Sequence, residues 1–275
     1  MTVDLPVAEV LVDRSGASGG ESVLAPEPGE PALARLYGYP TGSPSRPWVR
    51  ANMISTVDGA VAGADGRSGS INGPADWRAF RVMRALADVV LVGAGTARSE
   101  GYTALSAPTD LVGLRERTVG SAPLAVAVVT GSGGVPERLA DAAARPDGAG
   151  PVWVVTTRSG AVRAVEHVRE DRVVVAGEDD VDLATALAAL ADHGLRRVLC
   201  EGGPGLLSSM LEEDLVDELC LSTAPTVVGG PSPRAVSGSE VLSPAREARL
   251  EHLLHADGVL LARWNLRTDG TSPVG

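Results

Sequence analysis

Glu201 and the glycines after it are the residues whose types best suit catalysis and ligand binding. In "RVLCEGGPGLLSSML", residues 197–211, an apolar run ends at this acid, and a Gly-rich turn precedes a second apolar run. Glycines let backbone amides approach an anion, and a helix N-terminus adds free N–H groups and partial positive charge. The segment predicts a strand, a phosphate-binding turn and a helix, although a tight turn without a ligand fits the same pattern. The cofactor contacts expected here are Gly202, Gly203, Gly205 and Leu206.

A second Gly-rich loop follows another apolar run, in "VLVGAGTARSEGY" (90–102). Its third glycine is misplaced for a GxGxxG fingerprint, and no Gly-Lys-Ser/Thr follows, so neither a standard Rossmann loop nor a P-loop is present. Two Gly loops at strand ends predict one extended ligand with a pyrophosphate. Gly95 and Thr96 are the candidate contacts in this loop.

Hydroxyl groups and one guanidinium follow two further apolar runs, in "TGS" (130–132) and "TTRS" (156–159). An arginine with hydroxyls at a strand end can hold the 2′-phosphate that distinguishes NADPH from NADH. A solvated surface arginine is the alternative for Arg158. The pattern predicts NADPH, with Thr130, Ser132, Thr157 and Arg158 as contacts.

Two acids at strand ends, Asp58 and Glu201, are the catalytic candidates. In a nicotinamide reductase the protein orients the cofactor against an electrophilic carbon, and a nearby carboxylate can orient substrate or relay the accompanying proton. A turn cap is the alternative for Asp58, and a charge partner at a helix N-terminus is the alternative for Glu201. His252 and His255 form an H-x-x-H without a third ligand, so no metal site is expected.

These residues need a sheet to position them. Nearly continuous Val/Leu runs indicate strands covered on both faces, and they alternate with helical stretches, which predicts an α/β fold with a mainly parallel sheet. "DELCLSTAPTVV" (217–228) and a hairpin over 248–267, turning at Asp257-Gly258, predict antiparallel strands at the end. The strands are expected at 48–55, 88–93, 124–130, 152–157, 172–177 and 197–202, and the helices at 74–87, 182–194 and 205–215.

Composition limits the partners and the compartment. The net charge of −11 argues against a nucleic-acid or anionic-membrane partner, and no apolar run is long enough to span a membrane. The two cysteines lie in apolar runs, as expected for buried thiols in a cytoplasmic protein. The N-terminus lacks the pattern of a signal peptide. Six prolines and a Ser/Gly-rich stretch predict an irregular arm over residues 1–46, with room for a short helix only at 31–40, before a single domain over 47–275.

The motifs "MISTVDG" (53–59), "GRSGSINGPADW" (66–77), "RALADVVLVGAGTARSEGY" (84–102) and "CEGGPGLLSSML" (200–211) resemble the pyrimidine reductase family of bacterial riboflavin biosynthesis, over roughly residues 46–267. The resemblance implies a dihydrofolate-reductase-like fold and a homodimer. It also implies NADPH-dependent reduction of the ribosyl group of 5-amino-6-ribosylaminouracil 5′-phosphate to ribityl. It assigns substrate contacts to Ser68, Arg84 and Glu201 and cofactor contacts to the two Gly loops.

The chain departs from the family pattern at several substrate positions. Ala60 replaces a frequent Lys or Arg, Glu100 replaces an Asp, and the arginine expected after residue 102 is missing. The zinc-deaminase motifs of bifunctional members are also missing from the sequence. Two alternatives therefore stay open: reduction of a pterin, which needs no phosphate site, and a non-catalytic nucleotide-binding module.

Overall fold

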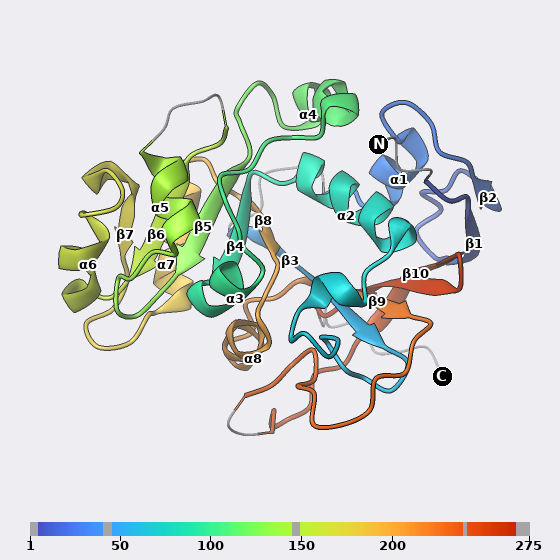
Figure 1. Ribbon diagram of the computed structural model, residues 1–275. Helices are drawn as coiled ribbons and strands as arrows, with labels where there is room; N and C mark the ends of the chain where they lie inside the picture. Colours follow the sequence, from blue (N-terminus) through green and yellow to red (C-terminus); the bar gives the residue numbers. More distant parts are fainter. Residues whose placement is uncertain (1–4, 41–45, 145–148, 239–240, 268–275) are drawn as a thin grey trace.

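One mixed sheet organises the molecule, in a computed structural model that describes residues 5–40, 46–144, 149–238 and 241–267. The strand order is β2-β1-β10-β11-β9-β3-β8-β4-β5-β6-β7 (Figure 1). The strands are β1 (Ala8–Asp13), β2 (Val23–Leu24), β3 (Trp48–Thr56), β4 (Val89–Gly93), β5 (Ala125–Val129), β6 (Val152–Thr156), β7 (Val173–Val175), β8 (Arg197–Cys200), β9 (Glu218–Ala224), β10 (Arg249–Ala256) and β11 (Val259–Asn265).

The half of the sheet from β9 through β3 to β7 is parallel, as the apolar runs predict. Alternate residues of these strands enter two separate core clusters, one on each face. Side chains from α1 (Pro31–Leu36), α2 (Pro74–Leu86), α4 (Val112–Thr118) and α5 (Glu137–Ala143) fill the first cluster, and those from α7 (Leu183–Asp192) and α8 (Pro204–Glu212) fill the second. The short helices α3 (Ala94–Ser99) and α6 (Arg158–Ala164) follow β4 and β6 directly. The expected α/β fold is confirmed.

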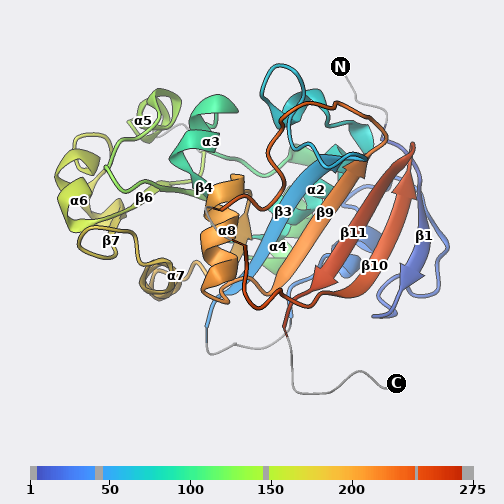
Figure 2. The same ribbon diagram turned by 90° about the horizontal axis from the view of Figure 1, so that it is seen from below.

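The other half of the sheet is antiparallel, from β9 through β11 and β10 to β1 and β2 (Figure 2). The β10–β11 hairpin turns at Asp257 and Gly258, whose φ angles are 48° and 79°. Both central residues of a tight turn of this hand need positive φ, which explains the Asp-Gly pair. The predicted hairpin is confirmed.

The N-terminal region differs from the expected irregular arm. Residues 8–13 form β1, which extends the sheet by pairing with β10, and the short helix α1 begins at Pro31 as expected. Arg78 of α2 holds this region against the helix. Its guanidinium donates hydrogen bonds to the carbonyl oxygens of Pro6 and Leu24 and to the buried Glu30 carboxylate. The sequence did not indicate this strand, because it is short, it lies among prolines and glycines, and its partner strand is about 240 residues away.

Both cysteines are buried, and neither of them forms a disulfide. Burial raises the pKa of each thiol to about 12, so both stay protonated at neutral pH. Among the described residues, none of the helices is both long and apolar enough to cross a bilayer.

Candidate active site

The two Gly-rich loops meet at the carboxyl ends of β4 and β8, which are neighbours in the sheet. The amide of Gly93 donates to the carbonyl oxygen of Gly202 at 2.8 Å. A Cβ added to Gly203 would lie 2.3 Å from Oγ1 of Thr96, so only glycine lets the loops approach this closely. The parallel sheet therefore brings together two loops that are about a hundred residues apart in the chain.

Glu201 lies at the centre of this arrangement, directly after β8. The guanidinium of Arg84 on α2 donates to both carboxylate oxygens, at 2.8 and 2.7 Å, and the hydroxyl of Tyr102 donates to one of them. The Glu201 side chain is only 3% exposed, and the Arg84 guanidinium also stacks over the ring of Phe80. A bidentate pair backed by a third donor fixes the carboxylate orientation. Burial and the neighbouring carboxylate raise the pKa of Tyr102 well above its ordinary value, so it remains a donor.

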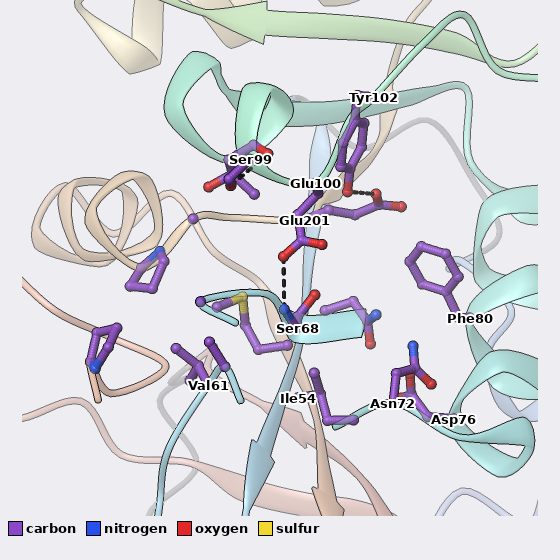
Figure 3. Close-up of a pocket in the computed structure, with 18 residues that line it drawn as sticks. Ile54, Val61, Ser68, Asn72, Asp76, Phe80, Ser99, Glu100, Tyr102 and Glu201 are labelled. Atoms are coloured by element: carbon purple, nitrogen blue, oxygen red, sulfur yellow. Dashed lines mark hydrogen bonds between the residues drawn. The ribbon is translucent and has the colours of Figure 1, made fainter. Parts of the chain in front are cut away.

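A pocket of about 220 Å³ opens beside Glu201 (Figure 3). Four of the predicted site residues line it: Ser68, Thr96, Glu201 and Gly203. Ser68 starts a short 3-10 turn, and its backbone amide donates to the Glu100 carboxylate at 2.8 Å. Glu100 stands where the family pattern has an aspartate, and this bond ties the Ser68 loop to the loop after β4. The remaining lining residues are Asn52, Met53, Ile54, Val61, Ala62, Gly66, Asn72, Asp76, Phe80, Ser99, Glu100, Tyr102, Pro204 and Pro233.

Arg84 is not among the residues that line this pocket. Its Nε and Nη2 groups both donate to Glu201, and its expected contact with substrate stays a prediction. In this geometry Arg84 positions the glutamate.

Asp58 lies outside the pocket, in the turn after β3. It accepts hydrogen bonds from the Thr56 hydroxyl and from the backbone amides of Val228 and Gly229. The Thr56 hydrogen bond and these amides lower the pKa of this exposed carboxyl. The geometry matches the turn-cap alternative, with the added role of joining the turn to the loop after β9.

The hydroxyls expected to contact cofactor lie at the carboxyl ends of β5 and β6, beyond the pocket. Thr157 caps α6: its hydroxyl accepts from the Gly160 amide and donates to the Gly131 carbonyl oxygen. Thr130 and Ser132 follow β5. Arg158 is 71% exposed and pairs with Glu178. These residues share one edge of the sheet with the Gly loops, and their cofactor contacts stay predictions.

Most residues that line the pocket were not among the predicted site residues, and Tyr102 and Asp76 are two of them. Tyr102 is the last residue of a quoted motif, but its contact with Glu201 depends on how the loop after α3 folds. Asp76 is only two residues into α2, where an acid is ordinarily explained as a favourable charge at a helix N-terminus. In the structure it is buried and lines the pocket. Its hydrogen bond with Ser222 of β9, 146 residues away in the chain, was the missing information.

Comparison with known proteins identifies the family of this chain. The sequence model of the family described as RibD C-terminal domain matches residues 47–261 of this chain. The chain belongs to the RibD C-terminal domain family. The resemblance stated from the motifs is confirmed, and the matched range leaves the N-terminal β1, β2 and α1 outside the family model.

Two relatives and one solved structure illustrate the family. The 2,5-diamino-6-ribosylamino-4(3H)-pyrimidinone 5′-phosphate reductase of Methanothermobacter thermautotrophicus is 33% identical over 208 residues, which are 75% of this chain and 91% of that protein. The protein of the same name from Archaeoglobus fulgidus is 29% identical over 213 residues, 76% and 94% of the two chains. A pyrimidine reductase-like protein from Corynebacterium diphtheriae superposes with a TM-score of 0.70 at 23% identity, covering 81% of this chain and 93% of that one.

Proposed function

We propose that the protein reduces the ribosyl group of a ribosylaminopyrimidine 5′-phosphate to ribityl in riboflavin biosynthesis, with NADPH as reductant. The family and the names of the two archaeal relatives support the reaction class. The single observation that carries the proposal is the Glu201 carboxylate, held by Arg84 and Tyr102 in a pocket that Thr96 and Gly203 of the two Gly loops also line.

The residues at the sheet edge fit a dinucleotide phosphate. Gly203 precedes the nine-residue helix α8, whose first backbone amides have no partner within the helix. Gly95, at the start of α3, has no atom within 4 Å of where a Cβ would stand, so a ligand can approach its backbone. Thr130, Ser132, Thr157 and Arg158 lie further along the same edge, where an adenosine 2′-phosphate would be held. When bound, NADPH supplies a hydride.

The protein's own groups supply orientation and the proton path. Glu201 accepts hydrogen bonds from substrate hydroxyl or amino groups on the side of the pocket next to Thr96 and Gly203, and a proton can pass through it by way of a water molecule. Arg84 and Tyr102 keep this carboxylate in one orientation. Ser68 offers a hydroxyl from the opposite wall. Reduction of an imine or opened aminoribose needs one hydride and one proton, and the site accounts for both.

The test is conversion of substrate. The purified protein should oxidise NADPH with 5-amino-6-ribosylaminouracil 5′-phosphate or with 2,5-diamino-6-ribosylamino-4(3H)-pyrimidinone 5′-phosphate. Mass spectrometry should show a product heavier by one hydride and one proton. Dihydrofolate serves as the third substrate, because a pterin reductase was the alternative from sequence. Reduction of dihydrofolate alone would refute the proposal, and no oxidation with any of the three would support the non-catalytic alternative.

A further inference from the structure

A second cavity, with a volume of about 510 Å³, lies where the parallel strands begin, at the opposite end from the Gly loops. Trp48, the first residue of β3, and Arg197, the first residue of β8, line it, together with residues near the carboxyl ends of α1, α2 and α4. The candidate active site lies where the same strands end. The two cavities share no lining residue, and the volume of this one is in the range of pockets that hold small organic ligands.

The cavity carries one unpaired positive charge. Its acid, Asp88, accepts hydrogen bonds from the backbone amides of Arg196 and Arg197, at 3.0 and 2.7 Å, and from the Arg197 guanidinium at 2.7 Å. Asp88 and Arg197 therefore neutralise each other. The exposed Arg196 guanidinium also belongs to the lining, and it has no hydrogen-bond or ion-pair partner among the described residues. In a chain with a net charge of −11, a surplus cation at a cavity favours an anionic ligand.

Two aromatic side chains, Tyr39 and Trp48, also line the cavity. An arginine stacks on each ring: the guanidinium carbon of Arg50 is 4.4 Å from the centroid of Tyr39, and that of Arg267 is 4.4 Å from the centroid of Trp48. The stacked arginines hold the rings in place, and each occupies only one ring face. The other face of each ring is left for a second planar group.

The indole N–H of Trp48 is a donor without an acceptor. Its nitrogen is buried and has no hydrogen-bond partner in the described part of the chain. A buried donor left unpaired is destabilising, so a bound group that supplies an acceptor is the ordinary explanation for one. The cavity thus combines two ring surfaces with two free donors, the indole N–H and the Arg196 guanidinium. A ligand that matches this set is planar, has acceptors on its ring and is anionic at one end.

We propose that this cavity binds an aromatic mononucleotide. Its ring lies beside Tyr39 and Trp48, and the indole N–H donates to an acceptor of the ring. Its phosphate lies at Arg196. A single phosphate is assigned because Arg196 is the one cation of the described lining that has no partner. The inference goes beyond the proposed reaction and does not depend on it.

Titration with flavin mononucleotide and with riboflavin tests the site, because the two fluorescent probes differ only in the phosphate. The wild-type protein should bind flavin mononucleotide about tenfold more tightly than riboflavin, as expected for one charge-assisted hydrogen bond. In Arg196→Gln this preference should fall below about threefold. The matched control is Arg14→Gln, which removes another exposed arginine without a side-chain partner among the described residues and should keep the wild-type preference. Trp48→Phe should weaken the binding of both probes by the same factor, because it removes only the donor to the ring.

Equal affinity for the two probes in the wild-type protein, or an unchanged preference in Arg196→Gln, would overturn the inference. Repeating the titrations with saturating NADPH should not change the affinities. Displacement of the flavin by NADPH would place it in the cofactor site and would also overturn the inference. Inorganic phosphate at the same concentration should not displace flavin mononucleotide, and displacement by it would contradict the role of the two rings. A flavin preference that depends on Arg196 would support the cavity even if no pyrimidine substrate were reduced, so failure of the proposed reaction is distinguishable.

Discussion

At the scale of residues, two carboxyl groups in one pocket have opposite surroundings. Glu201 has an arginine and a tyrosine bound to it, whereas Asp76 has only neutral donors. The first acid is therefore held in one orientation by charged and phenolic donors, whereas the second has no cation beside it.

Glu201→Gln should lower turnover by roughly tenfold to a thousandfold, the range for losing an orienting or proton-relaying group. The amide keeps the size of the side chain but cannot accept from both Arg84 and Tyr102 in the same way. The dissociation constant for NADPH, measured by nicotinamide fluorescence, should stay unchanged. Glu116→Gln, at an exposed position of α4, is the control and should behave as wild type. Unaltered turnover in Glu201→Gln would make the glutamate purely structural.

Asp76→Asn should change how stability depends on pH. Because burial raises the pKa of Asp76 from 3.8 to about 6, the folded protein binds this proton more tightly than the unfolded chain does. The stabilisation is complete below pH 3.8 and is lost as the pH rises to about 6. The ionisable groups it interacts with, Tyr37 and Cys220, stay neutral in this window because burial raises their pKa values.

The melting temperature of Asp76→Asn relative to wild type should therefore rise between pH 4 and pH 7. The rise should be about 5 °C if the whole pKa shift of Asp76, roughly two pH units, contributes to stability. Calorimetry at a series of pH values in the absence of substrate measures it. A difference that is constant across this range would show that Asp76 does not titrate there.

At the scale of elements, the site is built where parallel strands end. The Gly loops after β4 and β8 touch, and the hydroxyl-bearing ends of β5 and β6 continue the same edge. Strand order decides these neighbours: β8 lies between β3 and β4, so Glu201 emerges beside both β3 and the Gly loop after β4. Ligands bind at the carboxyl edge of such sheets for this geometric reason.

Gly203→Ala should weaken NADPH binding. Its Cβ would lie 2.3 Å from Thr96 Oγ1, so the loops must separate, at a cost of roughly 1–3 kcal/mol. Thr96→Ala removes the clashing atom, and the double variant should recover the melting temperature lost in Gly203→Ala. Gly73→Ala is the control, because no atom lies within 4 Å of its added Cβ. Normal affinity and melting temperature in Gly203→Ala would mean that the loops do not need this contact.

Arg158→Ala tests the cofactor assignment at the end of β6. The exposed guanidinium should add a charge-assisted hydrogen bond to a 2′-phosphate, worth about 1.5–3 kcal/mol. NADPH affinity should fall about tenfold or more and NADH affinity should not change, as measured by fluorescence titration. Arg169→Ala removes another exposed arginine paired with an acid and serves as the control. A loss that is equal for both cofactors would reject the 2′-phosphate contact.

At the scale of the whole molecule, residues 5–40 complete the sheet and the first core cluster. Leu24, Leu33 and Leu36 are buried with residues of α2, and Arg78 binds four carbonyl or carboxylate partners in the segment. The same helix supplies Arg84 and Asp76 to the candidate site, so the N-terminal segment supports the helix that shapes the site. The expected homodimer stays a prediction, which light scattering would check.

Glu30→Gln should destabilise the protein by about 3–5 kcal/mol, because it leaves the buried Arg78 guanidinium without its counter-charge. Urea unfolding followed by circular dichroism measures the change. Glu21→Gln breaks the ion pair with Arg35, whose two side chains are about half exposed, and should cost less than about 1 kcal/mol. Equal effects of the two substitutions would show that the segment from residue 5 to 40 contributes little to the stability of the domain.

The sequence by itself determined the parallel strands, the C-terminal hairpin and the place of Glu201 directly after a strand. Periodicity and turn chemistry are local: a Val-rich run, an Asp-Gly turn or a strand followed by glycines is recognisable within a few residues. The tertiary structure decided which polar groups meet. Four contacts join residues that are far apart in the chain. They are the pairing of β1 with β10, the hydrogen bonds that Asp58 accepts in its turn, the ion pair of Arg84 with Glu201, and the hydrogen bond of Ser222 to the buried Asp76. Because burial and partners determine the properties of a carboxyl group, only the folded chain could distinguish the acid that pairs with an arginine from the buried acid that has only neutral donors.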